Sequence, residues 1–153
     1  MRILAVDPNS DFLEILGFML RRDGHEVIFA HDEAGALRQF ATRRPDLVLA
    51  ETRLSAGSGW ALSEAVRAAG TTPFLFLAGS RGEDDPVRAR ELGADGYLNK
   101  PFSPRVLRDC VEAAARRRSL AAPRTAVAGE FGAGERKLDA QRQCSSFARG
   151  CRA

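Results

Sequence analysis

The 153-residue chain has few of the residues that build metal, redox or catalytic sites. Its three cysteines, Cys110, Cys144 and Cys151, are odd in number, and none has a His or Cys at metal-ligand spacing. We therefore expect reduced thiols, without a disulfide framework or a zinc site. The two histidines, His25 and His31, have no Ser or Cys arranged as in a catalytic triad, and we expect them at the surface.

Long apolar runs are also missing from the sequence. No segment approaches the roughly 20 apolar residues that a membrane helix needs. The N-terminal segment is too short, and charged too soon, for a signal peptide. A hydrophobic content of 44% is enough for one globular domain with its own core. These features predict a cytoplasmic protein that does not associate with membranes.

The chain has no strong excess of charge of either sign, since its formal net charge is +3. The basic excess is local: three arginines lie at residues 116–118, and the Ala/Gly/Arg-rich segment 120–153 carries most of the rest. Arginines in the last turn of a helix complement its dipole, so a solvated helix end explains them better than a phosphate-binding patch does.

Strand and helix patterns alternate five times between residue 2 and about residue 118. Parallel neighbours need crossover connections, so this alternation predicts a doubly wound α/β fold, a five-stranded parallel sheet with five helices on its two faces. The strands are expected at 2–6, 26–30, 47–50, 74–77 and 96–99, and the helices at 10–22, 33–43, 60–69, about 84–92 and 104–118. The C-terminal segment from residue 120 is expected to be poorly structured.

Four residues of interest end or follow predicted strands, namely Asp7, Glu51, Ala78 and Lys100. In open parallel sheets the binding crevice lies at the carboxyl ends of the strands. We therefore expect these four positions to converge on one pocket.

Four stretches of sequence resemble the receiver domain of two-component response regulators. They are residues 3–7, 45–51, 57–59 and 91–105, the last of which contains Lys100-Pro101-Phe102. The resemblance spans residues 2 to about 118 and is greatest to receivers with a winged-helix DNA-binding output. It implies a flavodoxin-like fold, a receiver domain at 1–119, and a non-enzymatic role in phosphorelay signalling.

The resemblance assigns roles to the pocket residues. In that family an aspartate on the third strand accepts a phosphoryl group from a histidine kinase, with help from magnesium, a second acid, a Ser or Thr, and a lysine. Carried over, Asp7 is the first acid and Lys100 is the lysine. Pro8 stands in place of the second acid, Glu51 in place of the acceptor, and Ala78 in place of the hydroxyl residue.

These three replacements predict an atypical receiver, or pseudo-receiver, that works without phosphorylation. Pro8 has no side-chain oxygen for a metal, and the longer Glu51 places its oxygens near where a phosphoryl oxygen would sit. Ser80 can replace the missing hydroxyl if the loop shifts its register. We expect no cofactor and weak or absent magnesium binding, with Asp7 and Glu51 as weak candidate ligands.

A metal-free ion pair between Glu51 and Lys100 would fix this pocket in one state, with Asp7 as a second partner and Arg53 able to fold over the mouth. The alternative is that Lys100 is simply solvated and Glu51 points to water. A third reading is an unusual receiver that is still phosphorylated.

In the family, the fourth helix, fifth strand and fifth helix bind partners or self-associate, and Tyr97 reports the state of the pocket. Expected partners are a histidine kinase or another regulator, or a second copy through this face. Three usual charged positions are replaced here by Gly96, Val106 and Cys110, which argues against the usual salt-bridged dimer. The replacements predict a more apolar contact surface built from Val106 and Cys110. The charged residues kept on or near the face are Arg88, Arg90, Glu91 and Asp95.

The segment 120–153 is too short for a complete winged-helix output domain, so nucleic-acid binding is not the first expectation. The alternative function is a remnant of a winged-helix transcription regulator whose basic tail still contacts nucleic acid.

Overall fold

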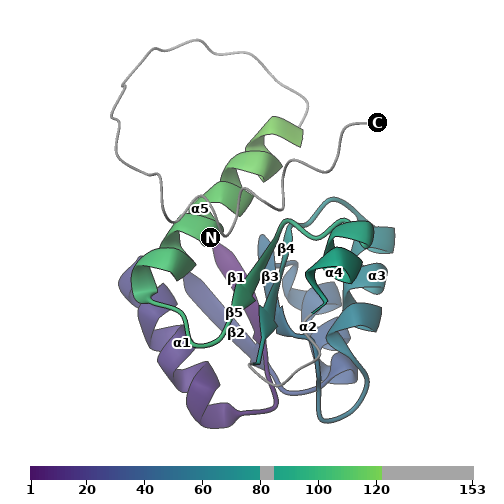
Figure 1. The fold of residues 1–153 in the computed structure, drawn as a ribbon, viewed down its shortest axis with the longest axis horizontal. Helices are drawn as coiled ribbons and strands as arrows, with labels where there is room; N and C mark the ends of the chain where they lie inside the picture. Colours follow the sequence, from purple (N-terminus) through teal and green to yellow (C-terminus); the bar gives the residue numbers. More distant parts are fainter. Residues whose placement is uncertain (80–84, 122–153) are drawn as a thin grey trace.

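The computed structural model describes residues 1–79 and 85–121, in which five strands and five helices alternate along the chain (Figure 1). The strands are β1 (Arg2–Val6), β2 (Glu26–Ala30), β3 (Leu47–Glu51), β4 (Phe74–Ala78) and β5 (Gly96–Asn99). The helices are α1 (Ser10–Arg22), α2 (Glu33–Arg43), α3 (Gly59–Ala69), α4 (Pro86–Glu91) and α5 (Pro104–Ala121).

The strands form one parallel sheet in the order β2-β1-β3-β4-β5. In this register Val6 pairs with Ala50, Glu51 with Leu77, and Ala78 with Asn99. The predicted flavodoxin-like doubly wound fold is therefore confirmed, and the carboxyl ends of β1, β3, β4 and β5 lie at the same edge of the sheet.

Helices cover both faces of the sheet. Figure 1 shows α1 and α5 on one side and α2, α3 and α4 on the other. All five residues of β3 and all five of β4 are buried, as expected for strands without polar alternation. Two apolar clusters result, one between the sheet and α1 with α5, the other beneath α2, α3 and α4.

Short polar side chains begin the helices, as the sequence indicates. Asn9 accepts a hydrogen bond from the backbone N–H of Phe12, and Asp32 accepts one from that of Gly35. The bounds differ from prediction at a few ends. Both β3 and β4 run one residue further because their parallel pairing continues, and α4 begins at Pro86, after its cap Asp85.

Several expectations fall on residues that the structure does not describe. Ser80 and the segment 122–153 lie outside the described ranges, so the domain boundary at 119 and the structure of the tail remain predictions. Within the described ranges, none of the helices combines the length and apolar character that crossing a bilayer requires.

Two predictions about Cys110 are wrong. Its side chain is 1% exposed and packs among the apolar residues beneath α5, so it adds nothing to an exposed contact surface. The expected reduced thiol is also wrong at this position, because the Cys110 sulfur is disulfide-bonded. Cys110 lies on the apolar stripe of α5, and that stripe faces the sheet.

Asp46, just before β3, connects the far end of α5 to the sheet. Its carboxylate accepts a hydrogen bond from Arg2 N at 2.7 Å and forms an ion pair with Arg118. Burial raises the pKa of Asp46, but the hydrogen bonds from Arg2 and Arg118 and the charges of Arg118 and the N-terminus outweigh it, so the net pKa is lowered.

Replacing Asp46 with asparagine is expected to lower the free energy of unfolding by about 1 kcal/mol near neutral pH. A carboxyl with a lowered pKa in the folded protein stabilises it above the unfolded pKa of 3.8. That stabilisation is lost as the pH falls through the folded value. Urea unfolding at about pH 7 and about pH 3 should thus show a difference from wild type that shrinks in acid. An equal difference at both pH values would contradict this account.

Candidate functional site

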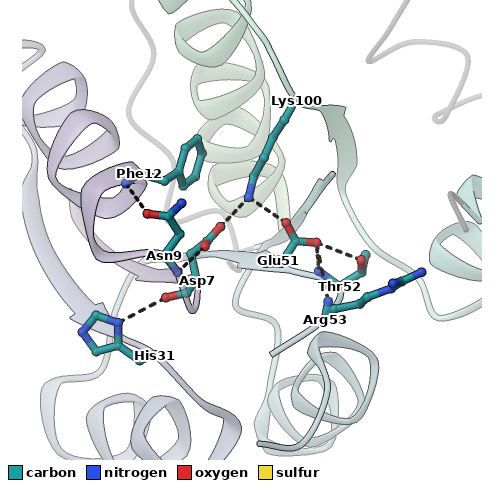
Figure 2. A network of polar contacts seen from close by, with 8 residues as sticks. All are labelled: Asp7, Asn9, Phe12, His31, Glu51, Thr52, Arg53 and Lys100. Carbon is teal, nitrogen blue, oxygen red and sulfur yellow. Dashed lines mark hydrogen bonds and ion pairs between the residues drawn. The ribbon is translucent and has the colours of Figure 1, made fainter. Parts of the chain in front are cut away.

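The strand ends bring one cation and two carboxylates together. Lys100, just after β5, contacts Asp7 Oδ2 and lies 2.6 Å from Glu51 Oε2 through its Nζ atom (Figure 2). The predicted ion pair, with Asp7 as second partner, is confirmed. The alternative with Glu51 pointing to water is wrong, because Glu51 is 8% exposed and Asp7 is 1% exposed.

Asp7 uses both carboxylate oxygens. Its Oδ2 atom contacts Lys100, and its Oδ1 atom accepts a hydrogen bond of 2.8 Å from the backbone N–H of Asn9. The His31 ring lies beside the same residue, with Nδ1 3.2 Å from the Asp7 carbonyl oxygen. Asp7 is thereby fixed between the end of β1 and the start of α1.

Glu51 is also held at both oxygens. While Oε2 faces Lys100, Oε1 accepts hydrogen bonds from Thr52 N at 2.8 Å and Thr52 Oγ1 at 2.9 Å, and Arg53 N lies 3.5 Å away. The extra methylene group of glutamate lets the carboxylate reach Lys100 and fold back to its own chain. Thr52, which sequence reasoning missed, is 8% exposed and satisfies a buried charge.

Lys100 is positioned by its backbone and by an aromatic ring. Its N–H donates to Ala78 O at 2.8 Å, and its Nζ atom lies 4.0 Å from the centre of the Phe12 ring. Phe12 in turn packs edge-on against Phe102 at 6.1 Å between ring centres. The face of the Phe12 ring covers the Lys100 ammonium group and adds a cation–π contact. The sequence alone indicates no role for Phe12 in the pocket.

The remaining predicted pocket positions surround this cluster without adding charge to it. Ala78 is fully buried in the cluster beneath α2, α3 and α4, whereas Pro8 is exposed. Arg53 does not fold over the mouth, because Figure 2 shows its side chain extending away from Lys100. That prediction is wrong for this structure.

The loop after β3 closes tightly against Glu51. Gly59 N donates to Thr52 O at 3.0 Å, and a Cβ at position 59 would lie 2.1 Å from Glu51 O. A side chain does not fit there, so glycine at 59 allows α3 to start directly against the acceptor position. The predicted Gly57-Ser58-Gly59 loop therefore has a steric role in the pocket.

Several residues of the predicted partner face make contacts within the chain. Tyr97 is buried, with its ring 6.4 Å from that of Phe76, and Arg88 lies over the Trp60 ring at 4.7 Å. Asp95 accepts a hydrogen bond from Phe74 N at 3.0 Å and forms an ion pair with Arg117. Among the other predicted members, Val106 and Arg90 are partly buried and Glu91 is exposed.

The residues present do not fit a magnesium ion. The oxygens of Asp7 and Glu51 that face each other both contact Lys100, and Pro8 offers no side-chain oxygen. Across residues 1–79 and 85–121, no group of three or more His, Cys, Asp or Glu side chains is arranged to hold a metal. The single positive charge of the Lys100 ammonium group contacts both carboxylates and offsets part of their negative charge.

Comparisons with known proteins agree with this architecture. A family model described as the response regulator receiver domain matches residues 3–112. The chain is 37% identical over 123 residues to the alkaline phosphatase synthesis transcriptional regulatory protein PhoP of Bacillus subtilis, covering 80% of this chain and 51% of that protein. It is 35% identical over 119 residues to the phosphate regulon transcriptional regulatory protein PhoB of Escherichia coli, covering 76% and 52%.

A solved structure of a response regulator receiver domain protein from Clostridium thermocellum superimposes with a TM-score of 0.74 at 27% identity. That match covers 78% of this chain and 97% of the other. The chain thus spans nearly the whole of a receiver structure, but about half the length of the curated relatives that it matches.

Proposed function

Because the chain belongs to the response regulator receiver domain family, we propose that it is an atypical receiver of two-component signalling that works without phosphorylation. The observation that carries this proposal is the bridge from Lys100 to both Asp7 and Glu51, with glutamate at the acceptor position. The bridge holds the pocket in one state, and the domain acts through contacts with other proteins.

The chemistry of phosphoryl transfer supports this proposal. A carboxylate nucleophile needs an accessible oxygen, an in-line approach and a cation that neutralises the incoming phosphoryl oxygens. Both oxygens of Glu51 already accept hydrogen bonds, from Lys100 on one side and Thr52 on the other. Freeing either oxygen would leave a buried polar group without its partner, which costs free energy.

The lack of a hydroxyl at Ala78 supports the same proposal. A phosphoryl group on residue 51 would find no hydroxyl donor at position 78. A movement of the end of β4 toward that group would therefore gain no hydrogen bond and would be little stabilised. Tyr97, which is already buried, would keep its position. Signalling would then depend on the amount of protein and on its partners, which we propose to be a histidine kinase or another regulator.

Magnesium titration followed by backbone NMR tests the proposal directly. We expect the amide signals of Asp7, Thr52 and Lys100 to stay in place on adding magnesium, alone or with beryllofluoride, because the facing oxygens of both carboxylates already contact Lys100. A receiver with the usual acids serves as the positive control. Saturable shifts at these three amides would contradict the proposal.

A second candidate is a transcription regulator with residual nucleic-acid contacts. It is favoured by the relatives, which are named as transcriptional regulatory proteins and are about twice as long as the matched region. This candidate depends on the basic segment 122–153, which lies outside the described residues. The proposal for the pocket does not depend on it.

A further inference from the structure

Helix α1 carries an exposed row of side chains along the side that faces away from the sheet. Its opposite side buries Leu13, Leu16 and Leu20 against the strands. Residues three and four apart share one side of a helix, and the exposed positions follow that spacing. We call this row the α1 stripe; it consists of Asp11, Glu14, Ile15, Phe18, Arg21 and Arg22.

The middle of the α1 stripe is apolar. Ile15 is 60% exposed and Phe18 is 68% exposed, which makes them two of the five large exposed apolar side chains in residues 1–79 and 85–121. An open hollow of about 650 Å³ lies beside Phe18, and Phe29 of β2 contributes to its lining. Because β2 is an edge strand, this hollow lies at the side of the sheet. Adjacent exposed apolar residues of this kind mark contact surfaces.

The charges of the α1 stripe are ordered by sign. The acidic side chains lie in its first half and the arginines in its last turn, on either side of the apolar centre. This order complements the helix dipole, but the dipole does not require Ile15 and Phe18 to be exposed between them. The pattern is self-complementary: when two such helices run antiparallel, acids face arginines at both ends and the apolar centres meet.

We propose that the α1 stripe is a self-association surface, through which two copies of the chain dock with their α1 helices antiparallel. Phe18 lies near the twofold axis and packs toward the hollow beside Phe29 of the other copy. Tyr97 and Cys110 of the predicted partner face are buried within the chain, so neither is available to a second copy. Such a dimer forms whether or not the pocket accepts phosphate.

Sedimentation velocity over a concentration series of the full chain tests this proposal. The wild type is expected to show a monomer–dimer equilibrium, and Phe18→Glu to raise its dissociation constant by about thirtyfold or more. Val87→Glu is the matched control, because Val87 is 58% exposed on α4 and lies outside the α1 stripe. It should leave the equilibrium unchanged. Circular dichroism checks that each variant is folded.

Charge reversal tests the antiparallel arrangement. Glu14→Arg and Arg22→Glu should each weaken self-association, since each places like charges opposite one another in a symmetric pair. An equimolar mixture of the two variants should recover a dimer, because both contacts then join opposite charges.

Three outcomes overturn the proposal. In the first, the wild type remains monomeric at every concentration. This outcome counts against the proposal even if Phe18 binds a histidine kinase instead. Val87→Glu, and not Phe18→Glu, can dissociate the dimer, which would place the contact on α4. The mixed charge variants can also fail to associate while the wild type dimerises, which would rule out the antiparallel pairing.

Discussion

Replacing Lys100 with methionine is expected to lower the free energy of unfolding by about 3 kcal/mol. The substitution keeps most of the side-chain volume over Phe12 but removes the cation between Asp7 and Glu51. Both carboxylates are almost fully buried, so they would face each other without compensation. Chemical denaturation with urea, followed by circular dichroism, measures the change.

The matched control removes the charges together. In a variant with Lys100→Met, Asp7→Asn and Glu51→Gln, most of the lost stability should return, because no buried charge is left unpaired. If Lys100→Met alone costs no more than an ordinary surface substitution, about 0.5 kcal/mol, then Lys100 does not hold the pocket as proposed.

A variant with Pro8→Asp, Glu51→Asp and Ala78→Ser is expected to gain phosphorylation. These three changes supply the missing acid, shorten the acceptor side chain so that it no longer folds back onto Thr52, and add a hydroxyl at the end of β4. Serine is chosen at position 78 because Ala78 is fully buried and serine adds one atom. Intact mass spectrometry after incubation with a small phosphodonor and magnesium measures the added phosphoryl group.

The single variant Glu51→Asp is the control for this experiment. It restores the acceptor but leaves Pro8 and Ala78, so we expect much less phosphoryl group than in the triple variant. Equal labelling of the two variants would show that positions 8 and 78 do not limit the reaction. No labelling of the triple variant, if it is folded, would contradict the assignment of these three positions.

Most of the fold could be predicted because its sequence signals are local and agree with one another. The uninterrupted apolar runs of β3 and β4 indicate strands covered on both faces, and Asn9 and Asp32 mark helix starts. The convergence of Asp7, Glu51 and Lys100 follows from parallel topology, since all three end or follow strands.

The finer features of the site depend on side-chain directions that spacing alone does not give. Thr52 looks like an ordinary loop residue in the sequence, yet its hydroxyl and backbone N–H both bind Glu51. Phe12 fits the apolar stripe of α1, and its place over Lys100 depends on where β5 ends. Arg53 points away from the pocket, a direction that its place in the sequence does not reveal (Figure 2).

The predicted partner face shows a different limit of sequence reasoning. A charged residue in a sequence does not reveal whether it pairs within its own chain. Arg88 packs over Trp60, and Asp95 binds Phe74 N and Arg117, so both make contacts inside the domain. By contrast, the exposure of Phe18 on α1 became evident in the folded structure, where the rest of its helix faces the sheet.

We expect that Glu51, bridged by Lys100, does not act as a phosphoryl acceptor. Intact mass spectrometry of the wild type beside the triple variant, with the same phosphodonor and magnesium, tests it most directly. We predict that the wild type keeps its mass while the triple variant gains one phosphoryl group. A wild-type chain that gains a phosphoryl group mapped to Glu51 would contradict the account.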